Sequence, residues 1–323
     1  MATDTSFWPV ATGADLDSFE QPMDLSARFP WGERTYVMGV LNVTPDSFSG
    51  DGLHIAGRET VAVACDQARA FLAAGADVID VGGESTRPGA EAVDAATEIA
   101  RVVPVIEAVR AAAPDAVISI DTSKAAVADE ALSAGAAIIN DVWALEADPA
   151  LGPLAAERGA PVILMHNRSR SDRLQADARL GGSYGGAAYD DVVADVAAAL
   201  TERADAAQAA GIPRDRIMLD PGLGFGKSVN QNLALINELD RLKALGYPVL
   251  LGPSRKSFIG RALDLPVDQR LEGTAAAVAL GIVRGADMIR VHDVQAMVRV
   301  ARMMDAMLQS KAVEDLSSSG GDR

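Results

Sequence analysis

The sequence predicts an α/β protein with a single (β/α)8 domain (a TIM barrel) behind an N-terminal extension. Eight short, continuously apolar runs alternate with Ala-rich stretches of helical periodicity. Several of these runs follow Gly-Ala or Gly-Tyr-Pro, where glycine suits the left-handed position that ends a helix. Eight strand–helix pairs in about 275 residues match the usual size of such a barrel. We therefore divide the 323 residues into an extension (1–34), a barrel (35–310) and a polar tail (311–323) that we expect to be disordered.

The expected elements alternate along the whole barrel. The apolar runs predict strands over residues 36–43, 76–82, 116–121, 136–141, 161–166, 216–221, 248–252 and 286–292. The helical stretches cover residues 58–74, 94–112, 123–134, 148–158, 187–210, 230–244, 268–284 and 294–309. A doubly wound sheet is the alternative, but the first strand runs into NVTPDSFSGDG without the Gly-rich dinucleotide turn of that fold. The extension, with aromatic residues at 7, 8, 29 and 31, is expected to be an extended arm that packs in part.

The composition excludes several classes of protein. With 29 basic and 45 acidic residues the formal net charge is −16, which argues against nucleic-acid binding and against an electrostatic membrane anchor. Hydrophobic residues make up 49% of the chain, enough for a large core, and no apolar run is long enough to span a bilayer. The acidic start is not a secretory signal, and the single cysteine, Cys65, excludes an internal disulfide. We expect a cytoplasmic protein.

Polar residues follow every predicted strand at its carboxyl end, which is where barrel enzymes build their active sites. Three of them directly precede helical stretches and suit helix caps: Ser123, Asp141 and Asp293. Five others end or closely follow buried apolar runs, where a polar group needs a partner: Asp121, Asn140, Asp220, Lys256 and Arg290.

The two kinds of polar group at these strand ends suit two parts of a ligand. The acceptors Asp121, Asn140 and Asp220 suit a planar nitrogen heterocycle, because a carboxylate accepts from adjacent N–H donors in a bidentate manner. The donors suit an anion such as diphosphate or carboxylate, and the start of the last helix adds free N–H groups. These donors are Arg87, Arg255, Lys256, Arg290 and His292. A flat heterocycle joined to a diphosphate would satisfy both sets.

Other features allow more than one interpretation. The Gly/Ser/Pro-rich segments 42–57 and 82–93 suit either lids that exclude water or ordinary connections. The segment 220–227, DPGLGFGK, resembles a phosphate-binding loop but lacks the P-loop spacing. Cys65 and His54 are expected to be inert, whereas His166 is either structural or part of the site. An apolar stripe on the last helix suits the core or a dimer interface; it comprises Met297, Val300, Met304 and Met307.

Motifs in a fixed order resemble those of the dihydropteroate synthases, pterin-binding enzymes of folate biosynthesis. They are MGVLNVTPDSFSGDG (38–52), DVGGESTRPGA (80–90), SIDTSK (119–124), IINDV (138–142), LMH (164–166), LDPGLGFGK (219–227), PSRKSFIG (253–260) and IRVHDV (289–294). The resemblance implies a transferase that joins 4-aminobenzoate to (7,8-dihydropterin-6-yl)methyl diphosphate and releases 7,8-dihydropteroate and diphosphate. It also implies a homodimer, a Mg²⁺ cofactor and inhibition by sulfonamides, which mimic 4-aminobenzoate.

The resemblance assigns site residues by motif. The pterin site would comprise Asp121, Asn140, Met165, Asp220, Phe225 and Lys256. The diphosphate pocket would comprise Asn42, Arg290 and His292, with Mg²⁺ bound to the diphosphate and to Asn42. The aminobenzoate pocket would comprise Phe48, Thr86, Arg87, Pro88, Phe225, Arg255 and Ser257. Asp121, Asp220 and Lys256 are the expected catalytic residues.

The implied mechanism is a dissociative substitution. Diphosphate leaves first, the carboxylates of Asp121 and Asp220 oppose the charge of the pterin-methyl cation, and the neutral aromatic amine then attacks. Three alternatives keep a barrel. A methyltetrahydrofolate-binding methyltransferase domain would lack the STRPG and SRKSFIG elements. A second alternative is a barrel that binds pterin but does not catalyse the condensation. A third, an enzyme acting on a phosphorylated sugar, would leave the acceptors Asp121, Asn140 and Asp220 unexplained.

Overall fold

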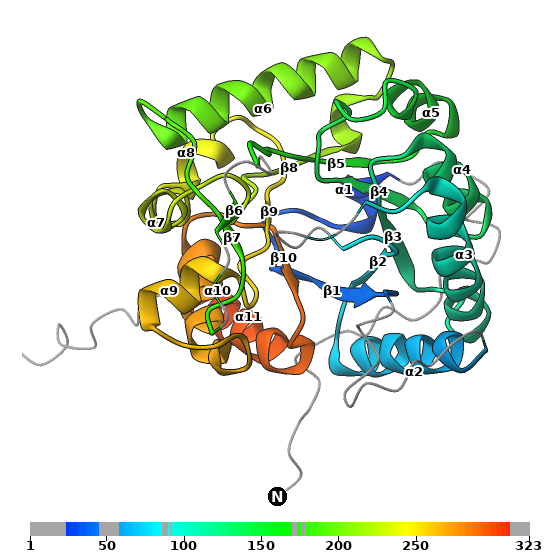
Figure 1. Cartoon of the computed structure of the whole chain (residues 1–323), viewed down its shortest axis with the longest axis horizontal. Helices are drawn as coiled ribbons and strands as arrows, with labels where there is room; N and C mark the ends of the chain where they lie inside the picture. Colours follow the sequence, from blue (N-terminus) through cyan, green and yellow to red (C-terminus); the bar gives the residue numbers. More distant parts are fainter. Residues whose placement is uncertain are drawn as a thin grey trace, which may run out of the picture.

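Eight parallel strands surrounded by helices form a barrel in the computed structural model of the chain (Figure 1). The structure describes residues 24–44, 58–85, 90, 92–169, 174–175, 177 and 179–310. The barrel strands are β1 (Tyr36–Asn42), β2 (Val78–Gly82), β3 (Val117–Asp121), β4 (Ile138–Asp141), β5 (Val162–Met165), β8 (Ile217–Asp220), β9 (Leu250–Leu251) and β10 (Met288–Val291).

The strand order confirms the predicted fold. Neighbouring strands follow the order β8-β5-β4-β3-β2-β1-β10-β9, and all of these pairs are parallel. A parallel bridge between Leu219 on β8 and Val249 beside β9 joins the two edge strands. Each strand lies within the apolar run that predicts it. All carboxyl ends therefore meet at one mouth.

The helices that cover the barrel also follow the prediction. They are α2 (Arg58–Ala74), α3 (Ala95–Ala112), α4 (Ala125–Ser133), α5 (Leu151–Arg158), α6 (Val192–Ala209), α7 (Val229–Asn237), α8 (Leu239–Lys243), α10 (Leu271–Val283) and α11 (Val294–Gln309). The stretch predicted as one helix over 230–244 is two, because Glu238 (φ −117°, ψ 29°) leaves the helical conformation between α7 and α8. Elements that were not predicted include helix α9 (Ser257–Leu263) and a hairpin of β6 (Leu174–Gln175) and β7 (Ser183–Tyr184).

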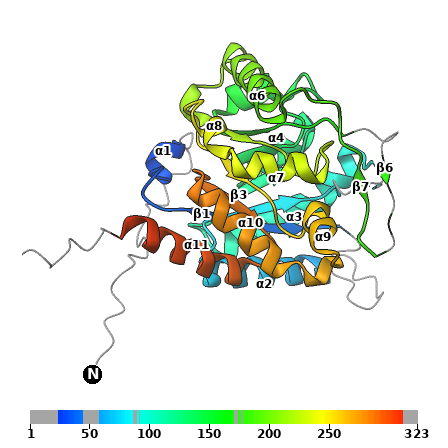
Figure 2. The same cartoon turned by 90° about the vertical axis from the view of Figure 1, so that its left-hand side faces the viewer.

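A separate apolar cluster fills the amino end of the barrel. It contains residues from the starts of the strands, among them Met38, Ile163 and Met288. The short helix α1 (Leu25–Arg28) adds Leu25 and Phe29, both buried. The described part of the extension is thus a helix and turn packed against the barrel, rather than an extended arm. Figure 2 shows α1 at one end of the molecule and the β6–β7 hairpin at the other.

Phe29 forms an aromatic group with two neighbours at this closed end. The centroids of its ring and the Tyr36 ring lie 5.0 Å apart, and Trp31 lies 5.4 Å from Phe29. Edge-on and tilted contacts at these distances stabilise aromatic pairs beyond their buried area. Because this end is packed with apolar side chains, the polar carboxyl end is the one available to a ligand.

The apolar stripe on α11 packs mainly against the core, and Cys65 on α2 is partly covered. On α11, Met297 is buried, Val300 and Met304 pack on the core, and Met307 is exposed, so most of the stripe belongs to the core. Cys65 is half-buried on α2, with its Sγ 3.6 Å from the Ala108 carbonyl oxygen, as expected for inert packing. Within the described ranges, no helix has the length and apolar content needed to cross a membrane.

Candidate functional site

The register of the strands brings the predicted polar residues to one level of the mouth. Asn42 on β1 pairs with Gly82 on β2, Gly82 with Asp121 on β3, and Asp121 with Asn140 on β4. A Cβ atom at Gly82 would lie 3.7 Å from Asn42 Oδ1 and 3.8 Å from Asp121 Oδ2. Glycine therefore leaves space between the amide of Asn42 and the carboxylate of Asp121.

On the other side of the mouth, Met165 on β5 pairs with Asp220 on β8. Asp121, Asn140, Met165 and Asp220 are all buried. The structure thus brings together the four strand-end residues expected to hold a flat heterocycle.

Arg290 connects three of the strands through a buried charge network. Its Nε donates to Asp80 Oδ2 and its Nη2 to Asp121 Oδ2, both at 2.6 Å. Asn140 Nδ2 donates to the same Asp80 oxygen at 3.0 Å. Asp80 is fully buried in β2 and was not predicted as a site residue, although a carboxylate in the middle of the apolar run 76–82, between Ile79 and Val81, was the available signal. Asp80 therefore joins an expected pterin residue, Asn140, to an expected diphosphate residue, Arg290.

The network shifts the ionisation of its members. Burial raises the pKa of Asp121 to about 7, and the Arg290 guanidinium opposes that shift. Burial alone would lower the pKa of Arg290, but the carboxylates of Asp80 and Asp121 outweigh it, so the pKa is raised. Arg290 thus stays positive, while Asp121 titrates near neutral pH.

Lys256, which is half-buried, and Asp220, which is buried, influence each other's ionisation at the mouth. Lys256 Nζ donates to the Leu223 carbonyl oxygen at 2.5 Å and lies 4.8 Å from the centroid of the Phe225 ring. Burial lowers the pKa of Lys256 to about 8, against the attraction of Asp220. Burial likewise raises the pKa of Asp220, whereas Lys256 and the Gly222 N–H, which donates to its Oδ1 at 2.7 Å, lower it. A cation, a carboxylate and an aromatic face therefore converge, as expected for the pterin site.

The loop 220–227 is held from inside by its own lysine. Lys227 is buried, and its Nζ donates to the carbonyl oxygens of Gly222 (2.8 Å), Phe225 (3.1 Å) and His166 (3.2 Å). Gly222 has a φ of +67°, and a Cβ there would lie 1.9 Å from the His166 oxygen, so only glycine fits. Lys227 therefore shapes the loop and does not face a phosphate, in agreement with the missing P-loop spacing.

His166 is a core residue at the end of β5. It is buried, and neither ring nitrogen has a hydrogen-bond partner among the residues that the structure describes. Burial lowers the pKa of His166 to about 3, and Lys227 adds to that effect. An imidazole that stays neutral at physiological pH fits the structural interpretation of His166.

Two more of the predicted donors, His292 and Arg255, lie at the rim of the mouth. His292 uses its backbone N–H and its Nδ1 to bond Ser254 Oγ at 3.1 and 3.0 Å. Arg255 is exposed, has a φ of +58°, and its Nε donates to Asp293 Oδ2 at 2.8 Å. Ser257 is half-buried at the start of α9. His292 and Ser257 thus lie at the mouth, while Arg255 is held by an ion pair at its edge.

The expectation that Ser123 and Asp141 cap helices is wrong, whereas Asp293 is the N-cap residue of α11, as expected. The N-cap residues of α4 and α5 are Lys124 and Ala150, and the side chain of Asp293 makes no cap bond. Asp141 instead accepts the backbone N–H groups of Trp143 and Leu145 in a turn. At Ser123 and Asp141 the chain turns at the end of the strand before the helix begins. The carboxylate of Asp293 pairs instead with the guanidinium of Arg255.

A pocket of about 280 Å³ opens beside Asp121. Its described lining includes Glu84, Ser85, Thr122, Asn167, Tyr184 and Phe225. Tyr184 comes from the unpredicted hairpin. Four residues expected around 4-aminobenzoate lie outside the described residues, as do His54 and most of the segment 42–57; these four are Phe48, Thr86, Arg87 and Pro88.

The described residues fit a magnesium ion that arrives with its phosphate ligand. They contain no group of three or more His, Cys, Asp or Glu side chains arranged to hold a metal. Asn42, half-buried at the end of β1, offers one amide oxygen beside the carboxylate of Asp121. A single protein ligand suits Mg²⁺, which keeps several waters and bridges phosphate oxygens, better than it suits an ion held in a protein cage.

The chain matches a known enzyme family over most of its length. The model of the pterin binding enzyme family matches residues 38–292, which include every strand-end residue described above. The chain belongs to this family. Within it, the chain is 47% identical to the dihydropteroate synthase of Bacillus subtilis over 283 residues, which are 87% of this chain and 91% of that protein.

Solved structures of pterin-binding enzymes agree. A Clostridium difficile dihydropteroate synthase, determined in the presence of pteroic acid, matches with a TM-score of 0.78 and 42% identity, over 87% of this chain and 100% of that one. A Xanthomonas albilineans dihydropteroate synthase with 4-aminobenzoic acid matches with a TM-score of 0.77 and 43% identity, over 86% and 94% of the two chains. The barrel and its family are therefore as predicted.

Proposed function

We propose that the chain is a dihydropteroate synthase that condenses (7,8-dihydropterin-6-yl)methyl diphosphate with 4-aminobenzoate. The observation that carries the proposal is the set of buried acceptors at one mouth of a pterin-binding barrel, Asp121, Asn140 and Asp220, with Lys256 and Arg290 beside them. Relatives that cover most of the chain bear the same name.

The pterin ring would lie between β3, β4 and β8. Asp220 accepts from a ring N–H and the exocyclic amine, because a carboxylate offers two oxygens to adjacent donors. Lys256 donates to the ring carbonyl, and Met165 supplies a buried apolar contact. Burial makes each of these polar contacts selective, since a ligand that fails to satisfy them leaves a desolvated group without a partner.

The diphosphate would lie at the rim, near Asn42, Arg290 and His292. When bound to the diphosphate and Asn42, Mg²⁺ would neutralise charge on the leaving group. Arg290 keeps its positive charge because two carboxylates hold it, so it is available to oppose the charge that develops on diphosphate. The carboxylates of Asp121 and Asp220 then face the positive charge left on the pterin-methyl group.

The final step would need no protein nucleophile. Loss of diphosphate breaks the C–O bond and leaves a cation delocalised over the pterin, which the neutral amine of 4-aminobenzoate attacks to form the C–N bond. Buried carboxylates stabilise that cation more strongly than solvated ones would, because the mouth has a low effective dielectric constant. A pKa near 7 means that Asp121 is partly ionised before a cation forms beside it.

Product analysis tests the proposal. The purified chain is incubated with both substrates and Mg²⁺, and the product is identified by chromatography and mass. We expect 7,8-dihydropteroate, dependent on both substrates and lost on chelation of the metal. Pterin binding without product would instead support a non-condensing barrel, and methyl transfer from methyltetrahydrofolate to a corrinoid would support the methyltransferase alternative.

Three further features are part of this proposal. Sulfonamides should compete with 4-aminobenzoate and not with the pterin diphosphate, because they mimic only the first; competition with the pterin would misplace the pocket. A homodimer is proposed from the resemblance and is tested by sedimentation. A cytoplasmic location is proposed because a single cysteine, which forms no internal disulfide, fits a reducing compartment.

A further inference from the structure

We infer that Lys124 is a positioning residue for the 4-aminobenzoate half of the proposed reaction, acting through Glu84 and Glu98 on one wall of the pocket. The inference rests on the proposed function. The expected site residues do not include these three side chains, although Lys124 ends the SIDTSK motif and Glu84 lies within DVGGESTRPGA.

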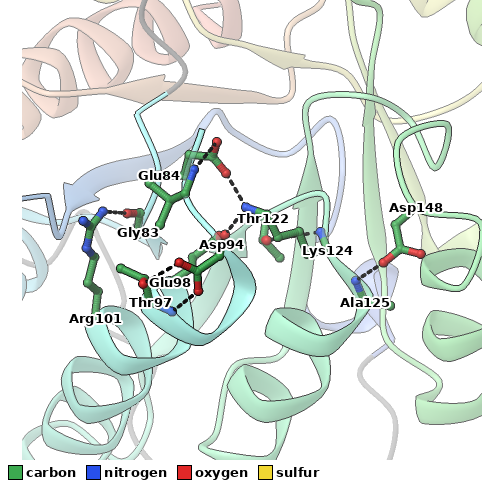
Figure 3. Close-up of polar contacts among 11 residues, drawn as sticks. Gly83, Glu84, Asp94, Thr97, Glu98, Arg101, Thr122, Lys124, Ala125 and Asp148 are labelled. Atoms are coloured by element: carbon green, nitrogen blue, oxygen red, sulfur yellow. Dashed lines mark hydrogen bonds and ion pairs between the residues drawn. The ribbon is translucent and has the colours of Figure 1, made fainter. Parts of the chain in front are cut away.

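Lys124 joins three elements of the barrel (Figure 3). It follows β3, Glu84 follows β2, and Glu98 lies in the first turn of α3. Lys124 Nζ pairs with Glu98 Oε2 at 2.5 Å and also pairs with Glu84 Oε2. One ammonium group therefore connects two carboxylates from neighbouring segments, and both carboxylate residues line the pocket.

Glu84 links the two ends of the connection between β2 and α3 to each other and to Lys124. Its Oε1 accepts the backbone N–H of Val93 at 3.2 Å, while its Oε2 accepts from Lys124. One carboxylate thus ties residue 84 to residue 93, at opposite ends of the connection. Ser85, Ala90 and Ala92, which lie between these ends, line the pocket.

The surrounding backbone is held as well. Arg101 Nη1 donates to the Gly83 carbonyl oxygen at 2.7 Å, and Asp94 Oδ1 accepts the Thr97 N–H at 2.8 Å as the N-cap of α3 (Figure 3). On the side of α4, Asp148 Oδ2 accepts the Ala125 N–H at 2.8 Å. These contacts hold the start of α3 on one side and the start of α4 on the other. We therefore infer that the Lys124–Glu84 pair sets the distance between α4 and the β2–α3 connection, which lines the pocket.

Burial makes the ammonium group necessary. The Glu98 side chain is 1% exposed, and its Oε1 has no hydrogen-bond partner among the described residues. Removing the lysine would leave this buried carboxylate without its cation and close to a second carboxylate, Glu84. The expected response is a displacement of Glu84 and of the wall attached to it. Small displacements of a substrate-positioning wall cost large factors in rate or binding.

Among the described residues, Lys124 Nζ bonds Glu84 and Glu98 and none of the pterin residues, and the link to that site is the charge of Glu98, which helps to raise the pKa of Asp121. Lys256, Asp220 and Asn140 are bonded to other groups, and the Arg290 network uses Asp80 and Asp121. A change at Lys124 should therefore act on the second substrate much more than on the first. A residue that only stabilised the fold would affect both substrates equally.

Steady-state kinetics of Lys124→Met, Lys124→Arg and Glu84→Gln test the inference. For Lys124→Met we expect the KM for 4-aminobenzoate to rise about tenfold, and the KM for the pterin diphosphate to change less than about twofold. Lys124→Arg, which keeps the charge, should recover most of the loss. Glu84→Gln keeps an acceptor for the Val93 N–H and leaves the Lys124–Glu98 pair intact, so we expect it to fold even if Lys124→Met does not. It should show the same pattern, a raised KM for 4-aminobenzoate and a nearly unchanged KM for the pterin diphosphate.

Lys243→Met is the matched control. Lys243 Nζ pairs with Asp287 Oδ2 at 2.6 Å, and the two side chains are 37% and 4% exposed. The Lys243→Met variant therefore also removes the cation from a buried carboxylate, but at a position away from the mouth. It should leave both KM values unchanged. Equal changes in both KM values, no change in either for Glu84→Gln, or the same split in Lys243→Met would overturn the inference. Failure of the wild-type chain to form dihydropteroate would instead refute the proposed function.

Discussion

Lys256 makes the proposed site sensitive to alkaline pH. Burial lowers the pKa of its ammonium group to about 8, so deprotonation occurs in an accessible range. A single group with that pKa is about nine-tenths protonated at pH 7 and about one-tenth protonated at pH 9. If the ammonium form binds the pterin carbonyl, kcat/KM for the pterin diphosphate should fall about tenfold between these pH values.

The assay is kcat/KM for the pterin diphosphate at saturating 4-aminobenzoate and Mg²⁺, measured from pH 6.5 to 9.5. Lys256→Arg carries a guanidinium that stays protonated, so its activity should show no fall over this range. Lys243→Arg is the control and should keep the wild-type profile, because Lys243 pairs with Asp287 away from the mouth. A flat wild-type profile, or an unchanged alkaline fall in Lys256→Arg, would refute the role of Lys256. If Lys256→Arg turns over too slowly, calorimetric binding of 6-hydroxymethyl-7,8-dihydropterin supplies the same comparison.

Three substitutions test other parts of the account. Asp220→Asn replaces an acceptor oxygen by a donor, so binding of 6-hydroxymethyl-7,8-dihydropterin should weaken about a hundredfold in calorimetry; unchanged affinity would remove Asp220 from the pterin site. Asp80→Asn leaves Arg290 with one carboxylate, and the free energy of unfolding in urea should fall by about 2–3 kcal/mol; a loss below about 0.5 kcal/mol would contradict the network. Phe29→Ala should lower that free energy by about 3 kcal/mol without changing kcat/KM; altered kcat/KM at unchanged stability would contradict a purely structural role.

Much of the fold could be predicted because the barrel repeats one simple pattern. Doubly buried strands are continuously apolar, and every described strand of the barrel lies inside an apolar run. The prediction failed where local geometry departs from that pattern. The break at Glu238 divides one amphipathic stretch into two helices, and the β6–β7 hairpin comprises two strands of two residues each, too short for an alternation to be visible.

The strand-end acceptors could be predicted for the same reason. Asp121, Asn140 and Asp220 end apolar runs, and parallel strands in a closed barrel present their carboxyl ends at one mouth. The supporting residues could not be predicted, because their roles depend on contacts between segments distant in the sequence. Asp80 meets Arg290 across 210 positions, and Lys124 meets Glu84 across 40.

The net charge of −16 was informative about some ligands only. It argued against nucleic acid and membranes, but both proposed substrates are anions. Arg290 and Lys256 place positive charge at the mouth. Local charges in a concave, low-dielectric site determine the sign of the ligand more than the total does.

A crystal structure of the chain with the pterin diphosphate and Mg²⁺, without 4-aminobenzoate, tests the central claim most directly. The account predicts the pterin ring inside the mouth, with its N–H edge on Asp220, its carbonyl at Lys256 and its diphosphate near Asn42, Arg290 and His292. A pterin bound elsewhere, or a diphosphate seated away from Arg290, would contradict the assignment of the site.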